Sequence, residues 1–318
     1  MNKIHEKSPC CSAPIRMFGE RRRQCSSCKK TWRVWQKKRG RKNKRLSINQ
    51  LFKYLDGKLN VSNTNNSNLR SLVRKFTSET SWISMPDGDL IVIADALIQY
   101  FGKQKYTIYF ILFRSVCDHK AYIFTPFMRK GCETVVGWHE AFAQIPNDVI
   151  ERIKALVCDG HGGLIYLAKN RDWKLQRCHF HLLARIGHYA SFGRLNRTKN
   201  IGKRVKNLAN IVLYKNNSVA VSLALAALKE LMMKITSRGL KAVISGFLRH
   251  YEDFRTYLKF PKYNLPATSN SAEHLVGLVR GLQYRARGFR TPSSLFMWIT
   301  AICKYKKHVT CRGKIQPN

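Results

Sequence analysis

The chain has 318 residues, of which 44% are hydrophobic, so it can form one large domain with a small appendage, or two domains. Lysine and arginine number 58 and aspartate and glutamate 18, which gives a formal net charge of +40. An enzyme of small acidic metabolites does not need such an excess. A polyanionic partner does, because each cation that neutralises a phosphate releases condensed counterions. Nucleic acid is therefore the expected partner, with an anionic membrane or a ribosome-like assembly as the alternative.

The sequence shows neither a clean bilayer span nor an export signal. The most apolar helix-like run, 219–235, is interrupted by Lys229, Glu230 and Lys234, and the N-terminus is charged. Ten cysteines without an export signal are expected to be reduced thiols. We therefore expect no membrane association and a cytoplasmic location, associated with the nucleoid if the source is prokaryotic.

Residues 1–45 predict a small zinc-ribbon-like module. Cys25 and Cys28 form a zinc-knuckle pair that is followed by Lys-Lys-Thr-Trp, as in zinc ribbons. The first half of the module is less regular, and we expect Cys11 as one ligand and either Cys10 or His5 as the other. Four such ligands would close a tetrahedral structural Zn²⁺ site that replaces the missing core of so small a module. The alternative is a ribbon that has lost its metal.

Two basic runs in this module are expected to contact DNA phosphates, although such a run is often only a solvated linker. The residues concerned are Arg21, Arg22, Arg23, Lys37, Lys38, Arg39, Arg41 and Lys42. Residues 46–86 follow with two short amphipathic helical patterns, which are compatible with a helix-turn-helix DNA-binding segment.

From residue 87 the pattern changes to that of an α/β core with a mixed sheet. Apolar runs predict strands at 90–94, 106–113, 121–124, 153–158 and 175–178. Helical patterns lie at 134–145 and 163–169. The sequence thus predicts a core over 87–181, an all-α insertion over 182–264, and C-terminal helices over 265–318 that carry Glu273.

Acidic residues are scarce, so those that follow apolar strands stand out. Asp95 follows the run 90–94, and Asp159 follows the run 153–158 and precedes Gly160, which permits close backbone approach. Strand-end carboxylates project at the rim of a sheet, where α/β sites lie. Glu273, on a predicted helix, could add a third oxygen ligand for hard divalent cations. Two such cations, roughly 3.5–4 Å apart, support phosphodiester cleavage by in-line displacement.

Each of these acids also has an interpretation without chemistry. A strand-end aspartate is often a turn former or a helix cap. Asn270-x-x-Glu273 fits a capping box, in which Glu273 would bond only the start of its own helix. The three acids indicate a catalytic site only together, in this order and in so basic a chain.

Four short motifs occur in order along the chain. They are Leu-Ile-Val-Ile-Ala-Asp at 90–95, Leu-Val-Cys-Asp-Gly at 156–160, Cys-His-Phe-His at 178–181, and Thr-Ser-Asn-Ser-Ala-Glu at 268–273 with Arg-Ala-Arg-Gly-Phe-Arg at 285–290. In this order they resemble DDE-class insertion-sequence transposases of the Mutator-like group. The resemblance covers residues 88–300 and the N-terminal ribbon.

The resemblance implies an RNase H-like catalytic core with Mg²⁺ or Mn²⁺ held by Asp95, Asp159 and Glu273. The gap of 273 − 159 = 114 residues is too long for a bare core of this kind and suits the all-α insertion. Cys178 and His181 would lie beside the site in an auxiliary role, because two ligands alone do not make a metal site. Their alternative is a buried thiol and a hydrogen-bonded imidazole with no part in the chemistry.

The implied activity is DNA transposition by a homo-oligomer. The enzyme would bind double-stranded DNA at the element ends, cleave it with a metal ion and transfer the 3′-hydroxyl to target DNA. Arg285, Arg287 and Arg290 would hold DNA near the site, and His161 could contact the scissile phosphate or nothing. The alternative is a non-catalytic DNA-binding protein derived from a transposase.

Overall fold

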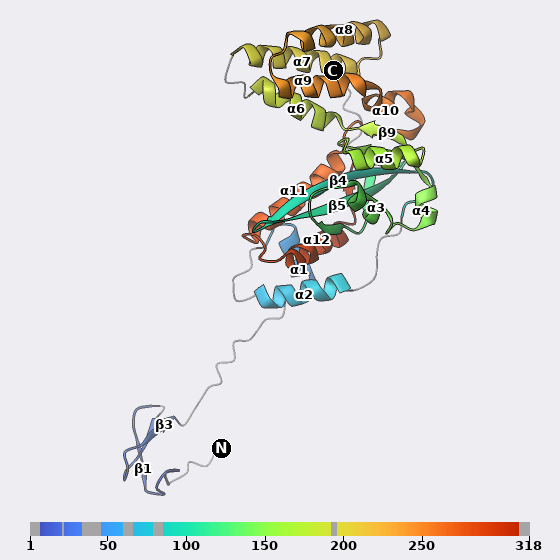
Figure 1. Cartoon of the computed structure of the whole chain (residues 1–318). Helices are drawn as coiled ribbons and strands as arrows, with labels where there is room; N and C mark the ends of the chain where they lie inside the picture. The colour runs from blue at the N-terminus through green and yellow to red at the C-terminus, as the bar shows by residue number, and fades with distance from the viewer. Residues whose placement is uncertain are drawn as a thin grey trace. The chain divides into compact units, whose positions relative to one another are not determined.

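The computed structural model describes residues 7–20, 22–33, 46–59, 66–78, 85–191 and 196–311. These residues belong to two compact units, a smaller one of Met1–Arg45 and a larger one of Leu46–Asn318 (Figure 1).

The smaller unit is an antiparallel sheet of three short strands: β1 (Ile15–Met17), β2 (Arg22–Cys25) and β3 (Thr31–Arg33). Cys25 is its only buried hydrophobic residue among those described. The described residues of this unit therefore form almost no hydrophobic core. Of the predicted phosphate contacts, Arg22 and Arg23 lie on β2. Outside the described residues lie His5, Arg21, Lys37, Lys38, Arg39, Arg41 and Lys42.

The larger unit is built on a mixed sheet, as predicted. Its strands are β4 (Leu90–Phe101), β5 (Gln104–Ser115), β6 (Lys120–Ile123), β7 (Phe127–Lys130), β8 (Ile153–Cys158), β9 (Lys174–Arg177) and β10 (His308–Thr310). The order is β10-β6-β5-β4-β8-β9, and β7 also pairs with β5. The sheet is antiparallel from β10 to β4, whereas β4, β8 and β9 are parallel. The strands β7 and β10 were not among those predicted.

The two faces of the sheet lie against different cores, and β4 contributes to both by alternation. Ile91 and Ile93 pack in one core, and Leu90, Val92 and Ala94 pack in the other. Successive side chains of a strand point to opposite faces, so Asp95 lies on the face of Ile91 and Ile93.

Helices from both ends of the larger unit cover the Asp95 face. They are α1 (Ile48–Leu55), α2 (Asn66–Ser78), α11 (Asn270–Arg285) and α12 (Pro292–Lys306). The opposite face is covered by α3 (Val135–Phe142), α4 (Asn147–Glu151) and α5 (Gly162–Asn170). The apolar stripes predicted within 46–86 are buried here, through Leu51, Leu55, Leu69 and Val73. The helices α1 and α2 therefore pack into the same hydrophobic core as the Asp95 face of the sheet.

A helical insertion follows β9 and has a core of its own (Figure 1). It comprises α6 (His179–Ser191), α7 (Asn196–Tyr214), α8 (Ser218–Lys234), α9 (Arg238–Arg249), η2 (Tyr251–Phe254), α10 (Thr256–Lys259) and η3 (Pro261–Tyr263). The buried Gln176 on β9 joins it to the sheet. Its Nε2 donates to the carbonyl of Phe254 at 3.0 Å, and its Oε1 accepts from the backbone N–H of Tyr257 at 2.9 Å. The strand that leads into the insertion is thus also bonded to the C-terminal part of the insertion.

Candidate active site

Asp95 does not end its strand, as the apolar run had suggested, but lies in the middle of β4. Residues beyond it stay in the strand because β5 pairs antiparallel with the whole of β4, including Asp95 with Phe110. The parallel pairing with β8 does end here, at Ile93 opposite Val157. Asp95 therefore lies just beyond the last residue of β4 that pairs with β8, although β4 itself continues to Phe101.

Asp159 directly follows β8, as predicted. It stands two residues after Val157, as Asp95 stands two after Ile93, so the register places the two aspartates at one level of the sheet. The backbone N–H of His161 donates to Asp159 Oδ1 at 2.8 Å. Gly160 between them has φ +98, and a Cβ there would lie 2.5 Å from Arg177 Nε. Only glycine fits this turn, which fixes the carboxylate at the end of the strand.

Glu273 lies in the first turn of α11, but it does not form the capping box that its spacing suggested. The cap residue is Ser269, which makes no side-chain cap bond, and Asn270 is already helical. Because the helix begins one residue earlier than the box requires, the Glu273 side chain is free to turn away from its own backbone. Its Oε1 lies 2.9 Å from His181 Nε2.

His181 and Cys178 connect the start of α6 to the start of α11. The backbone N–H of Ser269 donates to Cys178 Sγ at 3.2 Å, and that of His179 donates to the carbonyl of Ala267 at 3.0 Å. The Cys178 thiol and the Glu273 carboxylate raise the pKa of His181 to about 11. The imidazole of His181 therefore holds Glu273 in place through the contact with Oε1.

Ligand atoms of Asp95, His181 and Glu273 all lie within 4.8 Å of one another. Burial, followed by the charge of Glu273, raises the pKa of Asp95 to about 7, and the Asp159 carboxylate adds to this rise. The hydrogen bond from His181 lowers the pKa of Glu273. Asp159 is not within the 4.8 Å group but is close enough to repel Asp95. The structure thus brings together acids from β4, the end of β8 and α11.

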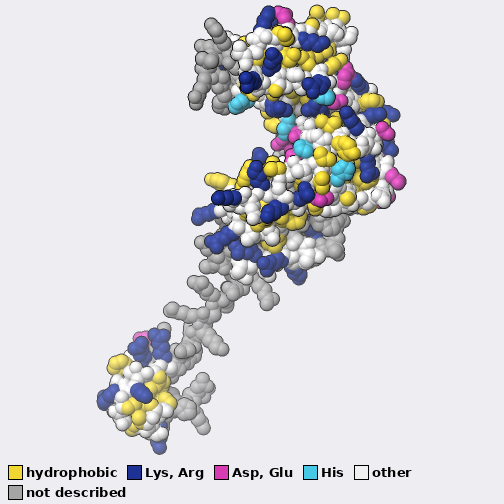
Figure 2. Space-filling view, in the orientation of Figure 1, with side chains coloured by type: hydrophobic (Ala, Val, Ile, Leu, Met, Phe, Trp, Pro, Cys, Tyr) yellow, Lys and Arg dark blue, Asp and Glu magenta, His cyan; other side chains and the backbone are white. Residues whose placement is uncertain are grey.

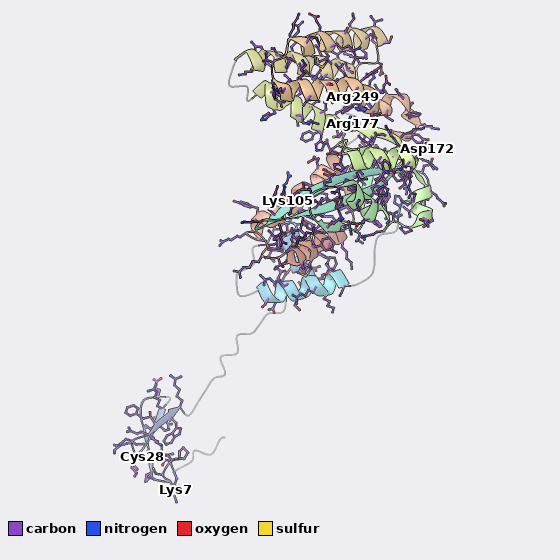
Figure 3. The ribbon with its side chains drawn as sticks, in the orientation of Figure 1. Lys7, Cys28, Lys105, Asp172, Arg177 and Arg249 are labelled. Atoms are coloured by element: carbon purple, nitrogen blue, oxygen red, sulfur yellow. The ribbon has the colours of Figure 1, made fainter. Side chains whose placement is uncertain are left out.

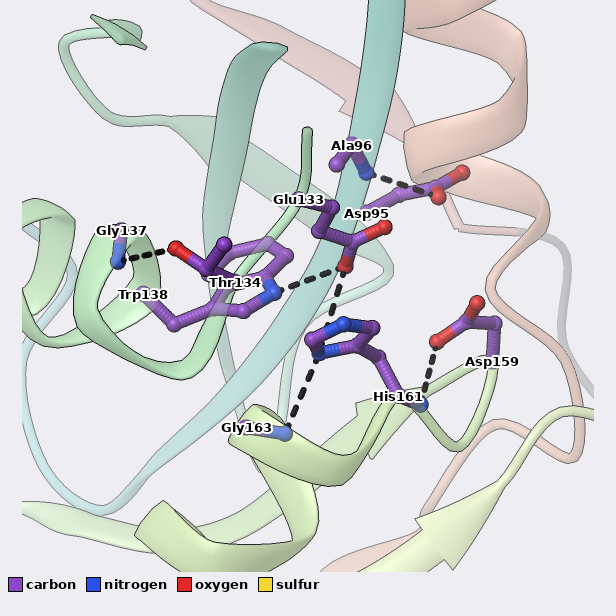
Figure 4. A network of polar contacts seen from close by, with 9 residues as sticks. All are labelled: Asp95, Ala96, Glu133, Thr134, Gly137, Trp138, Asp159, His161 and Gly163. Carbon is purple, nitrogen blue, oxygen red and sulfur yellow. Dashed lines mark hydrogen bonds and ion pairs between the residues drawn. The ribbon is translucent and has the colours of Figure 1, made fainter. Parts of the chain in front are cut away.

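A fourth acid, Glu133, lies beside Asp159 and was not singled out in the sequence (Figure 4). The buried Trp138 donates from Nε1 to Glu133 Oε1 at 2.8 Å, and His161 Nδ1 lies 3.6 Å from the same oxygen. The imidazole of His161 also accepts the backbone N–H of Gly163 at 3.1 Å, which caps α5. Burial raises the pKa of Glu133. Apart from the scarcity of acids, no local pattern marks this residue.

The three arginines expected to hold DNA differ in their surroundings. Arg285 is half-buried, and its Nη2 donates to the carbonyl of Leu55 at 3.0 Å, so it ties α11 to α1. Arg287 and Arg290 are exposed after the end of α11. On the face shown in Figure 2, Lys and Arg side chains are widespread, and some of the acidic and histidine side chains lie at the hollow between the insertion and the sheet.

In the smaller unit the four cysteines predicted as zinc ligands converge. The sulfur atoms of Cys10, Cys11, Cys25 and Cys28 lie within 4.8 Å of one another, and Cys28 is labelled in Figure 3. The Ser8 hydroxyl donates to Cys25 Sγ at 3.1 Å and is the main cause that lowers the pKa of Cys25 to about 6. Hydrogen bonding to Cys28 raises the pKa of Cys11 to about 12. Cys10 thus lies where a fourth ligand would be needed, while the alternative ligand, His5, lies outside the described residues.

No helix in the described part of the chain is both long enough and apolar enough to span a bilayer. No curated protein matches the sequence.

A family model for transposases of the Mutator family does match the chain, over residues 123–308, which is more than half of its length. The matched segment contains Asp159, His181 and Glu273, while Asp95 precedes it. The chain therefore belongs to the Mutator family of transposases.

Proposed function

We propose that this chain is a DDE transposase whose catalytic carboxylates are Asp95, Asp159 and Glu273, on an RNase H-like core. It cleaves double-stranded DNA at the ends of its element and transfers the 3′-hydroxyl to target DNA. One observation carries the proposal. Ligand atoms of Asp95, His181 and Glu273, which are far apart in the sequence, all lie within 4.8 Å of one another, and Asp159 is close enough to affect the pKa of Asp95.

The donor set suits Mg²⁺ or Mn²⁺. Carboxylate oxygens are the ligands that hard divalent cations prefer. Burial, and after it the charges of Glu273 and Asp159, raise the pKa of Asp95, and a bound cation would stabilise the ionised carboxylates. When bound, such ions would activate the attacking hydroxyl and stabilise the leaving oxygen of the phosphodiester.

The residues of this chain hold each carboxylate by one oxygen. The backbone N–H of Ala96 donates to Asp95 Oδ1 at 2.8 Å, and that of His161 donates to Asp159 Oδ1 at 2.8 Å. The imidazole of His181 holds Glu273 Oε1. The second oxygen of each carboxylate makes no hydrogen bond to the described residues, so it can face a cation. Fixed ligands of this kind preorganise a metal site.

Family membership implies that DNA is the substrate, and the charge of +40 supports this. We propose that Arg22 and Arg23 of the smaller unit and Arg287 and Arg290 of the larger one contact phosphates. The four cysteines would hold a structural Zn²⁺ that orders the smaller unit for recognition of the element ends. The active form would be a homo-oligomer on paired ends.

Strand transfer with the purified full-length chain tests the proposal. Duplexes that carry the terminal sequences of the element, a supercoiled target plasmid and Mg²⁺ or Mn²⁺ should give joined products. Asp159→Asn should abolish them. Asp172→Asn, which removes an exposed acid from the turn after α5 (Figure 3), is the matched control and should leave them unchanged.

Equal behaviour of the wild type and Asp159→Asn would contradict the catalytic assignment. If both bind the ends and neither joins DNA, the chain is a non-catalytic DNA-binding protein derived from a transposase.

A further inference from the structure

The helix α8 is apolar on two sides. Its inward side packs into the core of the insertion, where it contacts α7 and α9. On its outward side, Val219, Leu223 and Met233 are 65%, 66% and 75% exposed. A helix that is apolar on opposite sides is normally buried on both. Figure 1 nevertheless shows α8 as the outermost layer of the insertion.

The outward residues follow the spacing of a helix-pairing seam. Val219, Leu223, Ala226, Glu230 and Met233 are separated by four, three, four and three positions, and all are exposed. Alternating steps of four and three keep side chains along one line of a helix, as in pairs of packed helices. We name these five residues the outer seam.

The charge around the outer seam argues against a nucleic acid as its partner. The N-terminal part of α8 carries no charged side chain over residues 216–228, although the chain as a whole carries a net charge of +40. In its C-terminal part the acid of the outer seam, Glu230, is paired with Lys234, so the charges there largely cancel. A surface that binds phosphates would be expected to carry lysine or arginine at these positions. The outer seam therefore fits a protein partner with an apolar helix.

The two ends of the outer seam complement each other. At its C-terminal end lies a groove of about 620 Å³ between α8 and α9. It is lined by Lys229, Glu230, Met232, Met233, Ser245, Leu248 and Arg249, so its floor is apolar and its rim is charged (Arg249 is labelled in Figure 3). At the N-terminal end of the outer seam Val219 and Leu223 project into solvent. Ala226, midway between Val219 and Met233, is small enough for a second helix to approach closely.

We propose that the outer seam is a self-association surface. Two copies pack their α8 helices antiparallel about a twofold axis at Ala226, so that Val219 and Leu223 of each enter the groove beside Met233 of the other. Such an interface is isologous and closes after two copies. A single helix pair buries less than the roughly 800 Å² per partner of a standard interface, so we expect a weak dimer. The proposal does not depend on the catalytic assignment.

Cysteine cross-linking of the full-length chain without DNA, in high salt to screen repulsion, tests this geometry. Ala226→Cys should form a covalent dimer under mild oxidation, because the axis places this residue against its own copy. Val219→Cys alone and Met233→Cys alone should not, since each lies about 20 Å from its copy at 1.5 Å per residue. A mixture of the two should cross-link. The wild type measures the background from the native exposed cysteines, and peptide mapping assigns each new bond.

The dimer dissociation constant gives a second measurement, by sedimentation. Leu223→Glu should raise it at least about tenfold, as expected for a central apolar contact. Asn216→Glu adds the same charge just before α8, outside the outer seam, and should not change it. A monomer at all concentrations, or cross-linking of Val219→Cys to itself, would overturn the proposal.

Discussion

The two candidate metal centres of this chain are built in opposite ways. The cysteine cluster of the smaller unit comes from residues 10–28, in a unit where Cys25 is the only buried hydrophobic residue among those described. The carboxylate site joins Asp95, Asp159 and Glu273, with His181 beside them, on a sheet with two hydrophobic cores. The first centre would hold its fold together, whereas the second is held in place by its fold. Loss of a ligand should therefore have different consequences at the two centres.

The largest effect is expected at the carboxylates. Glu273→Gln and Asp95→Asn should each lower strand transfer by about a thousandfold or more, since the metal ions contribute several kcal/mol to transition-state stabilisation. Binding of end DNA and the circular dichroism spectrum should stay as in the wild type. Loss of DNA binding in all three carboxylate variants would show that these acids stabilise the fold.

At the cysteine cluster, removal of the metal should unfold one unit and spare the other. We expect about one Zn²⁺ per chain, released by a chelator or by Cys25→Ser. Hydrogen exchange should then become fast in residues 7–33 and remain slow in the sheet of the larger unit. End binding should weaken by about tenfold, because the ligand set and the basic residues share one unit. Cys132→Ser, an exposed cysteine outside the cluster, is the control. Unchanged exchange and end binding after chelation would contradict a structural Zn²⁺.

Metal binding at the carboxylate site should depend on pH. The pKa of Asp95 is raised to about 7, whereas that of Glu273 is lowered, so Asp95 is the acid that changes charge near neutrality. A cation binds the deprotonated form, so affinity rises with pH. We expect Mn²⁺ affinity, measured by calorimetry, to rise about tenfold from pH 6 to pH 8. Asp95→Asn should flatten this dependence; an equally steep curve in that variant would assign the titration to another group.

The smallest effect is expected at Glu133. In Glu133→Gln the amide oxygen can still accept the hydrogen bond of Trp138, but the charge beside His161 and Asp159 is lost. We expect strand transfer to fall by no more than about tenfold and stability to change by about 1 kcal/mol or less. A loss as large as that in Asp159→Asn would make Glu133 a fourth catalytic acid.

The strands could be predicted where their apolar runs are continuous. They could be predicted less well where the length or existence of a strand depends on hydrogen bonding to a neighbouring strand. The run 90–94 predicted the start of β4 but not its extension to Phe101, which depends on the hairpin with β5. The short strands β7 and β10 carry too few residues for a periodic pattern, and they exist because β5 and β6 offer them an edge.

The same division applies to the site. The convergence of Cys11, Cys25 and Cys28 could be predicted because their spacing is local, whereas Cys10 was left open against His5. Glu273 could be named by its motif, but its partner could not, because a capping box and a contact with His181 look alike in sequence. The proximity of His181 to both Asp95 and Glu273 depends on how α6 and α11 start side by side.

The position of the last helices has a consequence for synthesis of the protein. The core on the Asp95 face contains residues of α11 and α12 together with Val309, and β10 forms an edge of the sheet. When only the segment with Asp95 and Asp159 has left the ribosome, the nascent chain still lacks this half of its core, and it lacks Glu273, the third acid of the candidate site. Folding of the larger unit must then wait until α12 and β10 have left the ribosome. Prematurely terminated products would keep the basic segments near the N-terminus but lack Glu273, so we expect them to bind DNA without cutting it.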